Sequence, residues 1–189
     1  MITALDKNTA LILIDLQNSI VSMPVAHPVK DVLNNVNLLI DAFRKKDLPI
    51  VAVNVNPSGA AWTKTRKEAK PASFSNSEDW FKISKKANVV EGDIRITKHT
   101  WNAFFETPLN DELKKRNITG VVLAGISTSI GVEGTARAVS EIGYNITFAT
   151  NAKTDLQEEV HQRSIKYIFP RMGETGTTKE IIEMLEKTL

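Results

Sequence analysis

Five short apolar runs alternate with longer amphipathic segments in this chain, and this alternation constrains the fold more than any other feature. The runs cover residues 9–15, 49–55, 93–97, 120–125 and 145–150. Runs that are apolar on both faces are typical of parallel strands covered by helices on both sides. We therefore expect an α/β fold with an open, mainly parallel sheet of five or six strands, flanked by helices on both faces in a Rossmann-like three-layer arrangement.

Helical periodicity lies between the apolar runs. Apolar residues at a spacing of three to four predict a helix over 29–46, which should end before Pro49. Thr107 and Pro108 predict the start of another helix, with Thr107 as its N-cap, and Gly143 predicts the C-cap of a helix over 131–142. Two further helices are expected over 157–169 and 179–187. At 189 residues, we expect a single domain, 1–189.

Composition excludes several classes of chemistry. The chain has no cysteine, which excludes disulfides, a thiolate nucleophile and cysteine-ligated metals. His27, His99 and His161 show no metal-ligand spacing, so we expect no metal and no other cofactor. A net charge of +2, with the basic residues dispersed, predicts no nucleic-acid partner. No apolar run approaches the roughly 18 residues of a membrane span, and the first residues lack signal-peptide features, so we expect no membrane association and a cytoplasmic location.

Polar residues follow the predicted strands where such sheets bind ligands, beyond the carboxyl ends. Asp15 ends an apolar run, and Lys98 follows the third run. A buried carboxylate needs a partner or a raised pKa, so Asp15 is either a functional acid or a structural strand-end residue. Lys98 is either a surface lysine or a cation that pairs with Asp15 and with an anionic substrate.

The segment 125–131, Gly-Ile-Ser-Thr-Ser-Ile-Gly, joins a predicted strand to a predicted helix. Backbone N–H groups at such a junction favour negative charge, so the loop is a candidate anion or oxyanion site. Its hydroxyl groups are either nucleophiles or helix caps. A nucleophile needs a base and no histidine is near in sequence, so we expect at least one of them to cap the helix. Glu133 and Arg137, four residues apart, are expected to pair.

Residues 56–92 form a long excursion between two predicted strands, rich in Pro, Gly and Trp. It also contains a basic cluster, Lys64, Arg66, Lys67 and Lys70. The excursion is either a lid or binding loop, or a solvated loop with one helix near 78–86. The aromatic residues soon after Lys98 (Trp101, Phe104 and Phe105) either belong to the core or wall a ring-shaped substrate.

In this order and spacing, the motifs resemble those of the isochorismatase-like hydrolases, the cysteine hydrolase family of nicotinamidases and related amidases. The anchors are 13–18, Lys98 with 101–104 and 107–109, and 125–137, supported by 143–147 and 151–155. The resemblance covers nearly the whole chain, and it implies a parallel sheet flanked by helices.

The resemblance also implies roles for individual residues. Asp15 and Lys98 would be catalytic, and Gly131 occupies the position of the family's nucleophilic cysteine. A cis peptide bond at Ile126–Ser127 would turn the Ser127 N–H toward an oxyanion site shared with the Gly131 N–H. Substrate contacts are predicted at seven positions: Gln17, Asn56, Trp101, Phe104, Ile126, Ser127 and Ile130. The metal-binding histidines of nicotinamidases are missing from residues 54–92, which argues against nicotinamide as the substrate.

Without a thiolate, the acyl-enzyme route to amide hydrolysis is closed. True isochorismate hydrolases resemble this pattern with glycine at the nucleophile position, and in them a carboxylic acid protonates a vinyl ether. The first hypothesis is therefore a hydrolase of a small anionic molecule, with isochorismate as the candidate, Asp15 as general acid and Lys98 as its electrostatic partner. The second is a non-catalytic ligand-binding or structural oligomer subunit with a degenerate site. The third is an amidase that uses Ser127 or Ser129. Because family members are commonly oligomeric, we also expect a homo-oligomer that acts on a small molecule.

Overall fold

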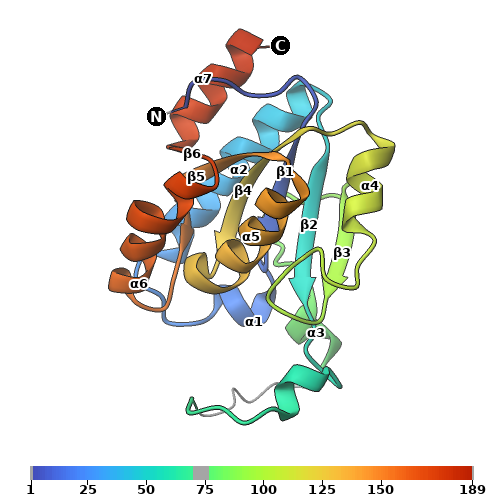
Figure 1. The fold of residues 1–189 in the computed structure, drawn as a ribbon, viewed down its shortest axis with the longest axis vertical. Helices are drawn as coiled ribbons and strands as arrows, with labels where there is room; N and C mark the ends of the chain where they lie inside the picture. The colour runs from blue at the N-terminus through green and yellow to red at the C-terminus, as the bar shows by residue number, and fades with distance from the viewer. Residues whose placement is uncertain (1, 70–76, 189) are drawn as a thin grey trace.

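A computed structural model describes residues 2–69 and 77–188, and within them it shows a six-stranded parallel sheet of order β3-β2-β1-β4-β5-β6 (Figure 1). The strands are β1 Thr9–Ile14, β2 Ile50–Val55, β3 Ile94–Lys98, β4 Gly120–Ile126, β5 Asn145–Thr154 and β6 Glu174–Gly176. Every neighbouring pair is parallel. The predicted fold class is confirmed.

Helices cover both faces of this sheet. The α-helices are α1 Asn18–Val21, α2 Val29–Lys45, α3 Glu78–Phe81, α4 Leu109–Lys115, α5 Glu133–Ile142, α6 Glu158–Arg163 and α7 Thr178–Thr188. Two short π-helices, η2 Thr128–Val132 and η3 Ser164–Ile168, and two 3₁₀ turns, η1 Ala61–Lys64 and η4 Phe169–Arg171, complete the described part of the chain. Among the described residues, no helix has both the length and the apolar character needed to cross a membrane.

The central strand β1 shows why its sequence is almost continuously apolar. All six of its residues are buried. Leu11 and Leu13 pack in the core under α2 and α7, whereas Ile12 and Ile14 pack in the core under α4 and α5. Because successive side chains of a strand point to opposite faces, burial on both faces removes the polar alternation of a half-exposed strand.

The chain order across the sheet creates a switch point at β1. The chain runs from β1 outward through β2 to β3, and then returns to place β4 on the other side of β1. In open α/β sheets, ligands bind beyond the carboxyl ends of the strands at such a point. Gly125 allows β4 to approach β1 here, since its φ is +125° and an added Cβ would lie 2.1 Å from the carbonyl oxygen of Ile14.

Several boundaries differ from those predicted. Strand β6 is short and polar, so it has no apolar run from which it could be predicted. The helix predicted over 131–142 begins as an α-helix only at Glu133, because the π-helical turn η2 precedes it. The helix expected near 78–86 is a single turn, α3. The N-cap of α4 is Pro108, although the Thr107 hydroxyl still accepts a hydrogen bond from the Leu109 N–H at 3.3 Å. Gly143 is a left-handed C-cap, as predicted.

Part of the 56–92 excursion is fixed against the carboxyl end of β1. Residues 70–76, which include Lys70 of the basic cluster, lie outside the described residues. Gln17 and Ile83 form an antiparallel bridge, and the Ser84 N–H donates to the carbonyl of Leu16 at 2.8 Å. The segment near Ile83 therefore lies close to Asp15. Its action as a lid stays a prediction.

Candidate functional site

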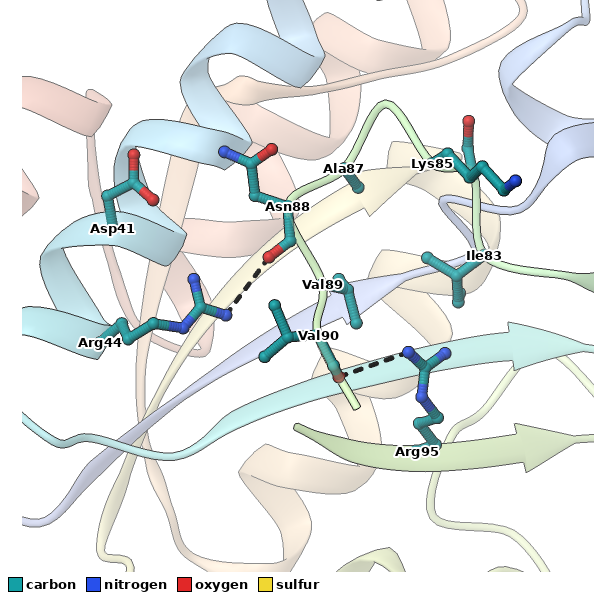
Figure 2. Close-up of a pocket in the computed structure, with 10 residues that line it drawn as sticks. Asp41, Arg44, Ile83, Lys85, Ala87, Asn88, Val89, Val90 and Arg95 are labelled. Carbon is teal, nitrogen blue, oxygen red and sulfur yellow. Dashed lines mark hydrogen bonds between the residues drawn. The ribbon is translucent and has the colours of Figure 1, made fainter. Parts of the chain in front are cut away.

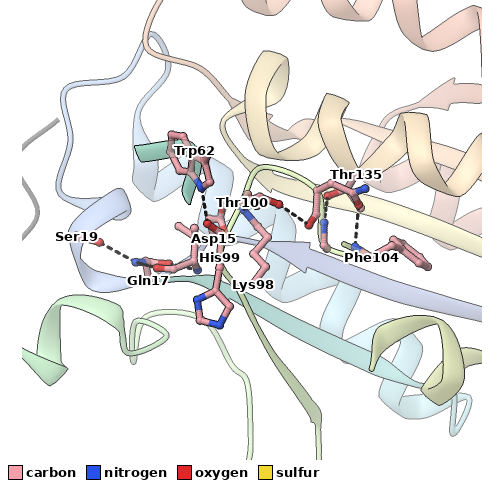
Figure 3. Close-up of polar contacts among 12 residues, drawn as sticks. Asp15, Gln17, Ser19, Trp62, Lys98, His99, Thr100, Phe104 and Thr135 are labelled. Atoms are coloured by element: carbon pink, nitrogen blue, oxygen red, sulfur yellow. Dashed lines mark hydrogen bonds and ion pairs between the residues drawn. The ribbon is translucent and has the colours of Figure 1, made fainter. Parts of the chain in front are cut away.

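Asp15 and Lys98 form a buried ion pair at the carboxyl end of the sheet (Figure 3). Lys98 Nζ donates to Asp15 Oδ2 at 2.8 Å and to the carbonyl of Thr100 at 3.0 Å. Lys98 is 1% exposed and Asp15 is 5% exposed. The backbone of Asp15 has a φ of 54°, a left-handed conformation that Asp tolerates better than most residues. Of the two alternatives for Lys98, the structure confirms the pairing with Asp15, since a surface lysine would not be buried. Two separate strands hold the pair.

Burial controls the protonation of Asp15. Removal from water raises the pKa of Asp15 to about 6, although the Lys98 ammonium acts in the opposite direction. The second carboxyl oxygen, Oδ1, is buried and has no hydrogen-bond partner among the described residues. A buried acceptor without a donor is costly unless it carries a proton or a ligand supplies one. Asp15 therefore has the environment of a carboxylic acid that can exchange a proton near neutral pH.

Gly131 faces this pair. A Cβ built on Gly131 would lie 2.9 Å from Asp15 Oδ2 and 3.7 Å from Lys98 Nζ. The peptide bond between Ile126 and Ser127 is cis, as predicted. Three strands thus bring the three residues predicted to be catalytic into one place, since Asp15 follows β1, Lys98 ends β3 and Gly131 follows β4.

The side-chain amide of Gln17 makes its hydrogen bonds within the protein. Its amide oxygen accepts from the Val55 N–H at 2.7 Å, and its Nε2 donates to the Val55 carbonyl at 3.1 Å and to the Ser19 hydroxyl at 3.0 Å. These bonds tie the end of β2 to the turn after β1. In the structure, Gln17 therefore links these two segments beside the site. Its contact with substrate stays a prediction.

Asn56 also lies at the edge of the site. Its N–H donates to the Lys98 carbonyl at 2.9 Å, and its own carbonyl lies 2.7 Å from His99 Nδ1. The two aromatic residues predicted to contact the substrate lie in different environments. Trp101 is 55% exposed and lines a pocket, whereas Phe104 is half-buried and packs against Tyr144, 6.3 Å between ring centroids. Phe104 thus belongs mainly to the core, because it follows Ala103 into the α4–α5 layer.

The remaining predicted contacts share the connection between β4 and α5. Ile126 is buried, whereas Ser127 and Ile130 are half-buried in the same turn that carries Gly131. The expectation that a hydroxyl here caps the helix is wrong, since neither η2 nor α5 has a side-chain cap. The turn winds as a π-helix, so Thr128 instead donates to the Thr154 carbonyl at 3.0 Å.

A polar network stands behind this turn. Thr128 Oγ1 lies 2.8 Å from His161 Nδ1, and the rings of His161 and His27 are 4.7 Å apart. Burial, followed by the nearby His27, lowers the pKa of His161 to about 4, so the ring is neutral near pH 7. Asp155 Oδ2 accepts from the Ser129 N–H at 2.6 Å. The network positions the backbone of the turn, and its histidine is bonded to a buried threonine rather than to a serine.

Glu133 anchors the helix that starts from this turn. Its carboxylate accepts from Arg137 at 2.7 Å, as predicted, and from the buried Ser164 hydroxyl at 2.7 Å. The helix α5 is thereby joined to η3. Among the described residues, no group of three or more His, Asp or Glu side chains lies close enough together to hold a metal ion.

The lining of a second concavity contains neither Asp15 nor Lys98. It lies between α2 and the 83–90 segment, and Figure 2 shows two guanidinium groups at its wall. Arg44 donates to the Asn88 carbonyl at 3.2 Å and forms an ion pair with Asp93 at 3.0 Å. Arg95 donates to the Val90 carbonyl at 3.3 Å. These groups hold the excursion to the sheet edge.

Two contributors to the site carried no decisive sequence signal, and a third, Phe105, is one of the aromatic residues that the sequence left open between the core and a substrate wall. The Thr100 carbonyl that binds Lys98 is a backbone group, and any residue could provide it. Trp62 comes from η1 and donates from Nε1 to the His99 carbonyl at 2.6 Å, a contact between segments 37 positions apart. Phe105 lines the same pocket as Trp101. Only the fold brings Trp62 to His99, so sequence spacing could not reveal this contact.

Comparison with known proteins agrees with this geometry. The family model described as the isochorismatase domain matches residues 9–180. The chain is 37% identical over 183 residues to the isochorismatase family protein YwoC of Bacillus subtilis (strain 168), with 95% of each chain covered. It is 36% identical over 184 residues to YecD of Escherichia coli O157:H7, covering 95% of this chain and 97% of that one. An isochorismatase family protein of Burkholderia thailandensis superposes with a TM-score of 0.93 at 32% identity, covering 98% of this chain and 100% of the other.

Proposed function

This chain belongs to the isochorismatase family of hydrolases, and we propose that it hydrolyses a small anionic substrate with Asp15 as general acid and without a covalent intermediate. The observation that carries the proposal is the state of Asp15. Its carboxyl group is buried, its pKa is raised to about 6, and Oδ1 has no hydrogen-bond donor among the described residues. A general acid needs a pKa near the working pH and a proton aimed at the substrate.

Covalent catalysis has little support here. The chain has no cysteine, and Gly131 offers no side chain at the position next to Asp15 and Lys98. Within the described residues, neither Ser127 nor Ser129 donates its hydroxyl to a base, since His161 is bonded to Thr128. A serine nucleophile needs such a base. A Cβ at Gly131 would lie 2.9 Å from both Asp15 Oδ2 and Ile14 Cγ2, so these two side chains already fill the space beside the glycine.

A vinyl ether such as isochorismate suits these groups. In the first step the proton of Asp15 forms a C–H bond at the terminal vinyl carbon, which leaves an oxocarbenium ion and an Asp15 carboxylate. Water then attacks the cationic carbon and returns a proton to Asp15. The resulting hemiketal breaks its C–O bond and gives a keto acid (pyruvate in the case of isochorismate) and an alcohol. Lys98 would stabilise the carboxylate formed in the first step, because its Nζ already contacts Oδ2 at 2.8 Å.

The test measures pyruvate released from isochorismate in a coupled lactate dehydrogenase assay. Asp15→Asn should lower kcat/KM by about 10²–10⁴, the usual contribution of a general acid. Asp31→Asn, which changes an exposed residue of α2, should leave the rate unchanged. Because the protonated acid is the active form, kcat/KM should fall as the pH rises above about 6.

Each result has a definite reading. Turnover that persists in Asp15→Asn, with thermal melting showing a folded protein, would reject Asp15 as the acid. No release of pyruvate by the unmodified protein would reject isochorismate as the substrate.

A further inference from the structure

The concavity between α2 and the 83–90 segment gathers hydrogen-bond donors that the proposed acid chemistry does not use. Its volume is about 530 Å³, within the range of about 300–1,000 Å³ that is usual for small-molecule sites. Three elements form its wall, namely α2, the 83–90 segment and the edge strand β3 (Figure 2). Each element supplies one cation to the lining: Arg44, Lys85 and Arg95.

Two of these cations have no carboxylate partner. Arg44 pairs with Asp93 at 3.0 Å, whereas Lys85 and Arg95 take part in no ion pair among the described residues. The lining has one acidic side chain, Asp41, which is exposed on α2 and lies well away from Arg95 in Figure 2. A bound dianion would therefore neutralise two positive charges that the protein leaves unpaired.

The two guanidinium groups are held in place and still have donors to spare. Figure 2 shows them reaching toward the 88–90 backbone from opposite sides. Within the described residues, Arg44 and Arg95 each make their hydrogen bonds through Nη2 alone. A guanidinium has five N–H donors, so Nε and Nη1 of each group stay available. The planar arrangement of these donors suits the oxygens of a phosphate or a carboxylate.

A buried hydroxyl adds a neutral donor to the same wall. Ser84 lines the concavity and is 5% exposed. Its oxygen accepts a long hydrogen bond from the Lys86 N–H at 3.4 Å, and its own proton has no acceptor among the described residues. Because a buried polar group without a partner is costly, the hydroxyl favours an acceptor bound in the concavity.

We propose that this concavity binds a small dianionic molecule, with a phosphate group or two carboxylates, through Arg44, Lys85 and Arg95. The site is separate from the Asp15–Lys98 pair, and the inference does not rest on the proposed function.

The ligand would hold together three elements that meet beside the Asp15–Lys98 site. The Ser84 N–H donates to the carbonyl of Leu16 at 2.8 Å, and Ile83 forms an antiparallel bridge with Gln17. An anion that contacts α2, β3 and the 83–90 segment at once would reduce local opening of this segment. Binding should therefore slow hydrogen exchange of its backbone amides.

Isothermal titration calorimetry with inorganic phosphate and with succinate tests the proposal, at about pH 8 and fixed ionic strength. At least one dianion should bind saturably, and the tighter of the two identifies the head group. Succinamide, which keeps the carbon chain and removes both charges, should not bind. Arg95→Met and Lys85→Met should each weaken binding by about 10-fold, the usual effect of losing one charged hydrogen bond. Arg95→Lys keeps the charge and loses the planar group, so it should weaken binding less than Arg95→Met does.

Lys45→Met is the matched control, because Lys45 is an exposed cation next to Arg44 on α2 but lies outside the lining. It should leave the affinity unchanged. Absence of saturable binding by both dianions would overturn the proposal, as would an equal loss in Lys45→Met, which would indicate general attraction to charge. Binding that persists unchanged in Arg95→Met and Lys85→Met, without slower exchange in 83–90, would place the anion elsewhere and would equally overturn it.

Discussion

Replacing Lys153 by methionine should stabilise this protein. The Lys153 side chain is 1% exposed, and its amine has no hydrogen-bond partner within the described residues. The amine lies 5.1 Å from the ring centroid of Phe148 and 5.0 Å from that of Phe169. Those two rings stack 4.0 Å apart. Methionine has nearly the same length and no group that requires hydration.

The size of the gain follows from the missing partner. An unsatisfied buried polar group costs about 1–3 kcal/mol, so Lys153→Met should raise the free energy of unfolding by at least about 1–3 kcal/mol. For a chain of this length, each 1 kcal/mol corresponds to about 2–4 °C in Tm.

The gain should also depend on pH. Burial holds the pKa of Lys153 well below 10.5 in the folded protein. Stability linked to a depressed pKa is complete above the unfolded value and is lost as the pH falls toward the folded value. Below pH 10.5 the unmodified protein therefore loses stability that the methionine variant retains. The difference should grow by up to about 1.4 kcal/mol per pH unit, until the folded-state pKa is reached.

Urea unfolding followed by circular dichroism at several pH values between 7 and 9.5 measures both effects. The control is Lys166→Met, because Lys166 is exposed and its amine lies 5.2 Å from the Tyr167 ring centroid. The control should change the free energy of unfolding by no more than about 0.5 kcal/mol. A loss of stability in Lys153→Met, or a gain that stays constant with pH, would refute the reasoning that the amine is buried without a partner.

Two further predictions concern the site and the network behind it. Gly131→Cys places a thiol beside the Asp15–Lys98 pair, and the side chains of Asp15 and Ile14 must shift because the new Cβ would lie 2.9 Å from Oδ2 of the first and from Cγ2 of the second. Iodoacetamide should alkylate this thiol at pH 7 about 10-fold faster than free cysteine, and a rate no greater than that of free cysteine would contradict the expected activation. His161 has a folded-state pKa of about 4, depressed from 6.5, so its contribution to stability is complete above pH 6.5 and is lost as the pH falls through about 4. Urea midpoints at pH 7 and pH 4.5 should therefore differ less in His161→Gln than in the unmodified protein, and an equal loss in both would argue that another group controls acid stability.

The sheet could be predicted because its strands are buried on both faces. A strand such as β1, in which every residue from Ala10 to Ile14 packs in one core or the other, must be almost entirely apolar, and this leaves a pattern visible in the sequence. The helix α2 is similarly visible, because its apolar residues follow a helical period. By contrast, β6 is three residues long and polar, and among the described strands it pairs only with the neighbouring β5. It exists because an edge strand completes backbone hydrogen bonds, which requires no particular side chains.

At the site, the sequence identified which residues have the right chemistry, and the tertiary structure decided what that chemistry is. Asp15 and Lys98 stand out because charged residues follow apolar strands, and their resemblance to a known motif placed Gly131 with them. The raised pKa of Asp15 depends on its burial by segments from across the chain, and the position of Trp62 depends on a contact with His99. Solvent exclusion and contacts between distant segments are properties of the packed molecule, so only the tertiary structure could decide them.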